Sequence, residues 1–252
     1  MASMRPGTKH AVSLLACSDG AMWQHELGRY DMAVKHVADQ KKTNELVPLD
    51  KWLWTEYPLA VRSRDTPHIS ANELSKIMKW KLLRGKFRPA LQALVEQNSD
   101  CNVIDISTAA IAVLDSGSWQ DALKKMTELR GVGPATASAL LAPLAPSVPF
   151  MADEVLEATT SKPRTYTQRA YNEMRDILEK NIQQINFGKF GMTMEEMGKA
   201  LWTRAVLGPD AFPAAPCVAK LDTPQEKQKI HKRKGCGDSD VSVRHNIKKS
   251  RQ

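Results

Sequence analysis

The sequence has no long apolar run and no cluster of cysteines. Its most apolar segment, residues 137–152, is interrupted by three prolines, so no stretch is suited to cross a bilayer. The N-terminus has a weak apolar run without the layout of a signal peptide. These absences predict no membrane partner, no metal and no cofactor. The scattered cysteines, which form no metal-ligand spacing and indicate free thiols in a reducing compartment, are Cys17, Cys101, Cys217 and Cys236.

Strand alternation is almost absent as well, whereas helical spacing recurs over most of the chain. Apolar residues from Trp23 to Val37 lie on one face of a helix, and Asp19 could cap the start of that helix. Capping boxes, in which Ser or Thr is followed three residues later by Glu, predict helix starts at Ser70 and Thr193. Residues 103–106 alone could pass for a strand. The sequence therefore predicts an all-α fold.

Positive charge is concentrated in the C-terminal part of the sequence. The net charge is +8, and residues 213–252 hold ten Lys or Arg against four acidic residues, so this tail carries +6. It has few large apolar residues, and we expect a disordered basic tail there. We expect a flexible N-terminus over 1–18 and a helical domain over 19–212. The run Lys232-Arg233-Lys234 is basic enough for nuclear import, although a cytoplasmic location is also open.

A helix-hairpin-helix is predicted over residues 118–142, with two helices joined by a turn. The turn lies in residues 129–137, which read Leu-Arg-Gly-Val-Gly-Pro-Ala-Thr-Ala. Glycines at 131 and 133 allow close approach to the backbone, so the N–H groups of Gly131, Gly133 and Ala135, with Val132 between them, could bind a phosphate. Lys124 and Lys125 precede the hairpin and could add charge. The simpler alternative is a glycine-terminated helix followed by a proline-started one, as in many bundles.

A second basic stretch alternates with aromatic residues and could lie along a nucleic-acid backbone. Its simpler interpretation, which we favour from the sequence, is an amphipathic helix with a solvated face. The stretch contains Lys79, Trp80, Lys81, Arg84, Lys86, Phe87 and Arg88.

The hairpin and the segment Val148-Pro149-Phe150-Met151-Ala152-Asp153-Glu154-Val155 together resemble the core of the helix-hairpin-helix base-excision DNA glycosylases. The resemblance covers about thirty residues. It implies a two-lobed helical bundle, double-stranded DNA as partner, a flipped damaged base in a cleft between the lobes, and hydrolysis of the N-glycosidic bond. It also leads us to expect a monomer.

The departures from this family narrow the expected chemistry. Members with lyase activity carry a lysine where this chain has Ala135, so the resemblance favours a monofunctional enzyme. The family's C-terminal iron–sulfur cysteines are absent. Either Asp153 or Glu154 could occupy the catalytic position, where a carboxylate stabilises the positive charge that develops on the sugar. The alternative is that both acids only complement a helix N-terminus.

Three aromatic residues in a short helix could line the pocket for the flipped base. They are Trp52, Trp54 and Tyr57; Asp50 could cap their helix, and Pro58 should kink or end it. Tryptophans in helical bundles lie more often in the core. The second hypothesis for the whole chain is a catalytically inactive helix-hairpin-helix protein that binds DNA or acts as a scaffold.

Overall fold

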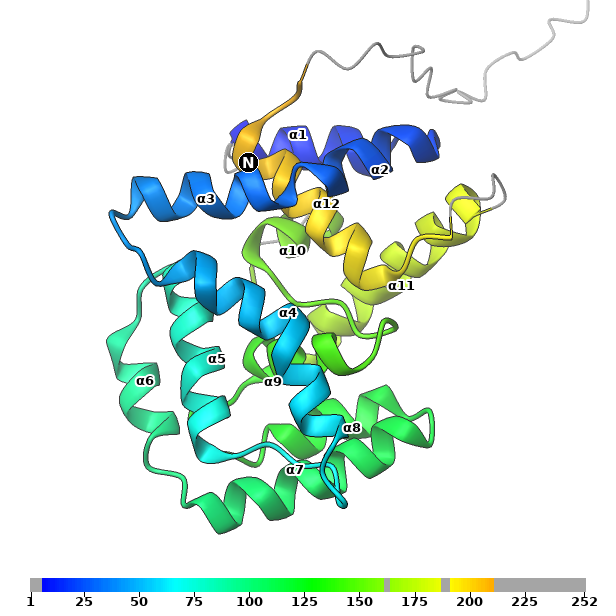
Figure 1. Cartoon of the computed structure of the whole chain (residues 1–252). Helices are drawn as coiled ribbons and strands as arrows, with labels where there is room; N and C mark the ends of the chain where they lie inside the picture. Colours follow the sequence, from blue (N-terminus) through cyan, green and yellow to red (C-terminus); the bar gives the residue numbers. More distant parts are fainter. Residues whose placement is uncertain (1–5, 161–163, 187–190, 211–252) are drawn as a thin grey trace, which may run out of the picture. The chain divides into compact units, whose positions relative to one another are not determined.

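The computed structural model describes residues 6–160, 164–186 and 191–210. Within them the chain is all-helical and has no strand, as the sequence predicts (Figure 1). No helix in these ranges is long and apolar enough to cross a membrane. The basic tail expected at 213–252 lies outside the described residues. The helices are α1 (Pro6–Leu15), α2 (Gly20–Gly28), α3 (Tyr30–Gln40), α4 (Leu46–Arg62), α5 (Ala71–Arg84), α6 (Pro89–Val95), α7 (Asp100–Asp115), α8 (Trp119–Met126), α9 (Pro134–Leu141), the 3-10 helix η1 (Ala142–Leu144), α10 (Asp153–Thr159), α11 (Gln168–Asn186) and α12 (Met194–Leu207).

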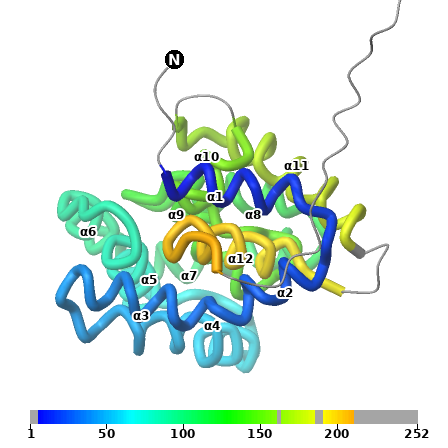
Figure 2. The backbone as a smooth tube through the Cα atoms, turned by 90° about the horizontal axis from the view of Figure 1, so that it is seen from above, coloured from blue at the N-terminus to red at the C-terminus, as the bar shows by residue number. Residues whose placement is uncertain are grey.

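The described helices pack in two groups, in agreement with a two-lobed bundle. Helix α12 is central to one group and contacts α1, α2, α3, α10 and α11. Figure 2 shows α12 between α1 and α3. Helix α5 is central to the other group and contacts α4, α6, α7 and α9, while α8 packs on α7 and α9. The groups are joined where α3 meets α4 and α5, and where α9 meets α11.

Local capping signals in the sequence are reproduced in the fold. The Ser70 hydroxyl accepts a hydrogen bond from the Glu73 backbone, and the Glu73 carboxylate accepts one from the Ser70 backbone, so the first predicted capping box is confirmed. The box at Thr193 is confirmed in the same way. Asp19 caps α2 through a 2.9 Å bond from the Ala21 N–H. The apolar face expected to run from Trp23 to Val37 belongs to two helices, because α2 ends at Gly28 and α3 begins at Tyr30, with Arg29 between them.

Helix α4 differs from the short capped helix that the sequence predicts. It runs for 17 residues straight through Pro58. Asp50 does not cap it, because this carboxylate is buried inside the bundle and accepts hydrogen bonds from Tyr30 Oη (2.9 Å) and Trp80 Nε1 (2.8 Å). The ambiguous residues 103–106 belong to α7. Tertiary packing therefore outweighs the local tendency of proline to end a helix.

The expectation of a flexible segment over residues 1–18 is wrong for its larger part. Helix α1 packs on α10 and α12 and buries Ala11 and Leu14. A side chain at Gly7 would place Cβ only 2.4 Å from the Ala205 carbonyl oxygen, so glycine permits this close helix–helix approach. Nearby, the sulfur of Cys17 is in a disulfide, so the expectation of a free thiol is wrong there, whereas it is confirmed for Cys101, which is free and exposed. Cysteine spacing along the chain does not determine which thiols meet in space.

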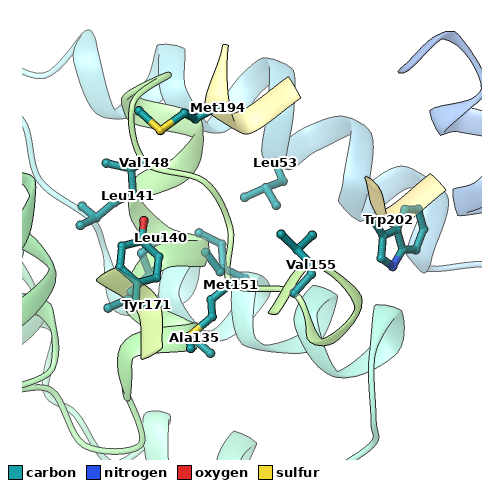
Figure 3. Close-up of a cluster of buried hydrophobic side chains, with 14 of the residues drawn as sticks. Leu53, Ala135, Leu140, Leu141, Val148, Met151, Val155, Tyr171, Met194 and Trp202 are labelled. Atoms are coloured by element: carbon teal, nitrogen blue, oxygen red, sulfur yellow. The ribbon is translucent and has the colours of Figure 1, made fainter. Parts of the chain in front are cut away.

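Helix α9 lies deep in the core, and residues 135–141 are all buried. Figure 3 shows Ala135 and Leu140 in the same cluster of buried side chains as Met151 and Val155. The small side chains of α9 allow this close packing. The core therefore fixes the second hairpin helix and the segment leading into α10 against each other.

Candidate functional site

The hairpin turn between α8 and α9 uses its two glycines differently. Gly131 has φ +75°, and an added Cβ would lie 2.9 Å from the Leu94 Cβ and 3.1 Å from the Val95 backbone nitrogen. Gly131 is thus required by backbone conformation and by packing on α6. Gly133 has an extended conformation, with no atom within 4 Å of an added Cβ, and it precedes Pro134, the first residue of α9.

The described hydrogen bonds reduce the set of possible phosphate donors in this turn. The Val132 N–H donates to the Leu129 carbonyl oxygen (3.1 Å), and its side chain is buried, so Val132 is removed from the predicted set. Within the described residues, no acceptor is found for the N–H groups of Gly131 and Gly133. The Ala135 N–H lies in the first turn of α9, where a helix leaves its N–H groups without intrahelical partners.

Lys124 and Lys125 lie in the last turn of α8. Lys124 is exposed, and Lys125 pairs with Glu128 at 2.9 Å. Neither lines the cleft described next. Any phosphate contact by these two residues would therefore be made at the outer surface of the hairpin.

A cleft lies between the two helix groups and encloses about 510 Å³, including its open mouth. Helices α5 and α9 contribute one side, and α10 and α12 contribute the other. It continues into a wider outer groove, bounded by Lys41, Arg164 and the start of α1. The cleft is lined by Lys81, Leu82, Arg84, Gly85, Lys86, Arg88, Leu91, Ala135, Phe150, Met151, Ala152, Asp153, Glu154, Tyr166 and Trp202.

Both predicted acids line this cleft as the first two residues of α10. The Asp153 carboxylate accepts a hydrogen bond from Tyr166 Oη at 2.8 Å and pairs with Arg164 at 2.5 Å. Arg164 also binds Glu157 at 2.8 Å, which fixes its orientation. Both acids also border the outer groove. Asp153 is therefore held in a defined position beside the cleft.

Basic side chains form much of the opposite side, contrary to the solvated face that the sequence favours. Lys81, Arg84, Lys86 and Arg88 all line the cleft. Lys79 follows the simpler interpretation, because it is exposed and pairs with Glu45 at 2.6 Å, and Lys86 is exposed as well. The expectation of a solvated face is wrong for Lys81 and Arg84, because the end of α5 lies at the cleft and both side chains line it.

Burial and the positive charge of Arg88 together lower the pKa of Lys81 to about 8, while the negative charge of Asp153 opposes both effects. The sequence places Lys81 in the basic stretch for which a solvated face is favoured, although a signal for its inward direction was present. This lysine lies seven residues after Leu74 and four after Ile77, on the apolar stripe of α5. A lysine on such a stripe faces the interior and not the solvent.

Arg84 is buried among aromatic rings at the inner end of the cleft. Its guanidinium lies 3.9 Å from the Trp202 ring centre and farther from the ring centres of Trp80 and Phe150, at 5.1 and 5.2 Å. Its Nε atom is buried without a hydrogen-bond partner among the described residues. Arg84 therefore places positive charge next to stacking surfaces.

The three aromatic residues expected in a base pocket separate in the fold. Trp54 borders a small recess beside the cleft, together with Phe150 and Arg84. Tyr57 is fully buried and donates to the Leu140 carbonyl oxygen at 2.9 Å. Trp52 packs on Tyr57, and the Lys76 ammonium lies over the Trp52 ring. Neither Trp52 nor Tyr57 lines the cleft. The aromatic residues of the cleft are instead Phe150, Tyr166 and Trp202.

Searches for related proteins do not identify the chain: no family model, no curated protein and no solved structure matches it. In the described ranges, no group of three or more His, Cys, Asp or Glu side chains is arranged to hold a metal ion. The function must therefore be argued from the cleft itself.

Proposed function

We propose that this chain is a DNA-binding protein of the DNA glycosylase superfamily that hydrolyses the N-glycosidic bond of damaged bases without a hairpin lysine. The observation that carries the proposal is one shared cleft. Ala135, at the start of the second hairpin helix, lines it together with Asp153 and Glu154. A phosphate held by the hairpin turn would thus lie on the same part of the molecule as two carboxylates.

The acids supply what this reaction needs. As the glycosidic bond breaks, positive charge develops on the sugar, and a fixed carboxylate stabilises that charge and can orient the attacking water. Tyr166 and Arg164 hold Asp153 in place. Glu154, which borders both the cleft and the outer groove, is the second candidate for the same role. Either acid could act while the other complements the N-terminus of α10.

The remaining cleft residues suit an extruded nucleotide. Phe150 and Tyr166 present aromatic surface, and stacking on such rings offsets the cost of removing a base from the duplex. Lys86 and Arg88 supply positive charge at the cleft for the phosphates that flank that nucleotide.

The test is base release from duplexes that each contain one lesion, drawn from a panel of alkylated, deaminated and oxidised bases. We expect release from at least one duplex and a decrease of at least about 100-fold in Asp153→Asn or Glu154→Gln. Asp105→Asn is the matched control, because Asp105 is exposed on α7 and does not line the cleft. No release from any duplex that the protein binds would contradict the catalytic part of the proposal.

A catalytically inactive DNA-binding protein is the second candidate, and one observation favours it. The Asp153 carboxylate is already occupied by Arg164 and Tyr166, as a purely structural acid would be. In that case Asp153→Asn would lower the stability of the fold and leave DNA affinity unchanged once the protein is folded. Measuring unfolding and base release on the same variant separates the two candidates.

A further inference from the structure

We propose that Lys81 is an amine nucleophile that forms an imine with the aldehyde of an abasic deoxyribose held in the cleft. The identity of this aldehyde rests on the proposed function, because loss of a base leaves a sugar whose ring-opened form carries an aldehyde at C1′. The surroundings of Lys81 indicate a reactive amine in the cleft, and they do so whether or not the chain releases bases.

The position of Lys81 differs from that of the other lysines nearby. It lies on the buried stripe of α5 and lines the cleft that Asp153 also lines. Within the described residues, no hydrogen bond or ion pair occupies its Nζ atom. By contrast, Lys79 pairs with Glu45, Lys41 donates to the Gly85 carbonyl oxygen, and Lys86, which also lines the cleft, is exposed. The Lys81 amine is thus available to a ligand in the cleft.

The surroundings of Lys81 also make its amine reactive at neutral pH. Only the unprotonated form is a nucleophile, and burial beside a second cation favours that form. With a pKa of about 8, about one amine in four is neutral at pH 7.5, against about one in a thousand at an ordinary lysine pKa. Arg88, which contributes to this lowered pKa, is itself a cleft residue.

The proposed step balances without a redox partner. The nitrogen lone pair of Lys81 attacks C1′, and the electron pair of the carbonyl bond moves to oxygen, which takes up a proton. The nitrogen then releases one proton. The hydroxyl oxygen takes up a second proton from solvent and leaves as water while the nitrogen lone pair forms the C=N bond, so a protonated imine joins Nζ and C1′. Asp153 lines the same cleft and can accept the proton that the nitrogen releases.

The test uses the full chain and a duplex that contains one preformed abasic site, made from a uracil-containing oligonucleotide. Sodium cyanoborohydride reduces an imine to a stable amine, so the covalent complex is counted on a denaturing gel and its site is mapped by peptide mass. We expect an adduct on Lys81, reduced at least tenfold in Lys81→Arg, which keeps the positive charge. The yield should also rise with a midpoint near pH 8.

Lys79→Arg is the matched control, since it changes an exposed lysine of the same helix, and its adduct yield should equal that of the unmodified chain. Circular dichroism and DNA binding establish that both variants are folded. An adduct that maps to another residue, an undiminished yield in Lys81→Arg, or no adduct with bound abasic DNA would overturn the proposal. Because the abasic site is preformed, this result does not depend on whether the chain releases bases.

Discussion

Asn98 holds the backbone of Arg130 through two hydrogen bonds: its Oδ1 accepts from the Arg130 N–H at 2.9 Å, and its Nδ2 donates to the Arg130 carbonyl oxygen at 3.0 Å. The same Nδ2 donates to the Val95 carbonyl oxygen at 2.9 Å. One buried amide therefore joins the end of α6 to the hairpin turn. The turn is fixed before any ligand arrives.

Asn98→Ala should destabilise the fold by about 1–3 kcal/mol, because it leaves partly buried backbone groups of Arg130 without partners. The measurement is the midpoint of urea unfolding followed by circular dichroism. Asn102→Ala, at an exposed position early in α7, is the control and should change the midpoint little. Equal effects of the two substitutions would mean that Asn98 does not anchor the hairpin.

Alanine should be tolerated very differently at the two hairpin glycines. Gly131→Ala should cost at least about 1–2 kcal/mol, since it combines a positive φ with a close contact to Leu94. Gly133→Ala should change stability by less than about 0.5 kcal/mol, because its Cβ enters open space. The added methyl group should nevertheless weaken DNA binding by obstructing phosphate approach. Thermal unfolding and a binding titration on each variant measure the two effects separately.

The lowered pKa of Lys81 predicts a pH-dependent gain in stability for Lys81→Met. Between about pH 8 and pH 10.5, the unfolded chain retains a proton that the folded chain has released, so the stability of the unmodified protein rises with pH there. Below pH 8 the folded protein carries the positive charge of Lys81, so the full cost of burying that charge reduces the free energy of unfolding. Lys81→Met should therefore be more stable near pH 7 by at most about 3 kcal/mol, with the gain declining towards pH 10.5. Denaturant unfolding at several pH values tests this, and a gain that grows with pH would contradict it.

Removing positive charge from the cleft should reduce the salt dependence of DNA binding. We compare the slope of log affinity against log salt concentration in Lys86→Gln and in Arg88→Gln. If each variant loses one phosphate contact, its slope should become shallower by about 0.9. Lys79→Gln is the control, because Glu45 already pairs with Lys79 away from the cleft. Fluorescence anisotropy at a series of salt concentrations gives these slopes. A slope unchanged in both cleft variants would place the DNA elsewhere.

The sequence predicts those parts of the fold that depend on neighbouring residues. The capping boxes at Ser70 and Thr193 are formed by side chains three residues apart, so their prediction needs no knowledge of the rest of the chain. The length of α4 was not predictable, because its continuation past Pro58 depends on packing against other helices. Helix α1 was missed for the same reason, since its partners α10 and α12 lie more than a hundred residues away.

The same distinction between neighbouring and distant residues applies to the candidate site. Ala135, Asp153 and Glu154 belong to one short segment, and their pattern selects them from the sequence. Lys81 and Tyr166 reach the cleft from other parts of the chain, so no local spacing relates them to Asp153. Only the apolar stripe on which Lys81 lies indicates its inward direction. Local patterns therefore predict the centre of the site, and the tertiary fold supplies its lining.

The packing of α12 between α1 and α3 also constrains how the chain is made. Trp202 lines the cleft, so this surface is incomplete until α12 has left the ribosome. Helix α1 is synthesised before the other described helices, and its apolar residues Ala11 and Leu14 have no α12 to pack against until almost 200 further residues have been added. Contacts so distant in sequence form slowly. During synthesis, this apolar face is therefore exposed to chaperones for longer than any surface formed within α4–α9.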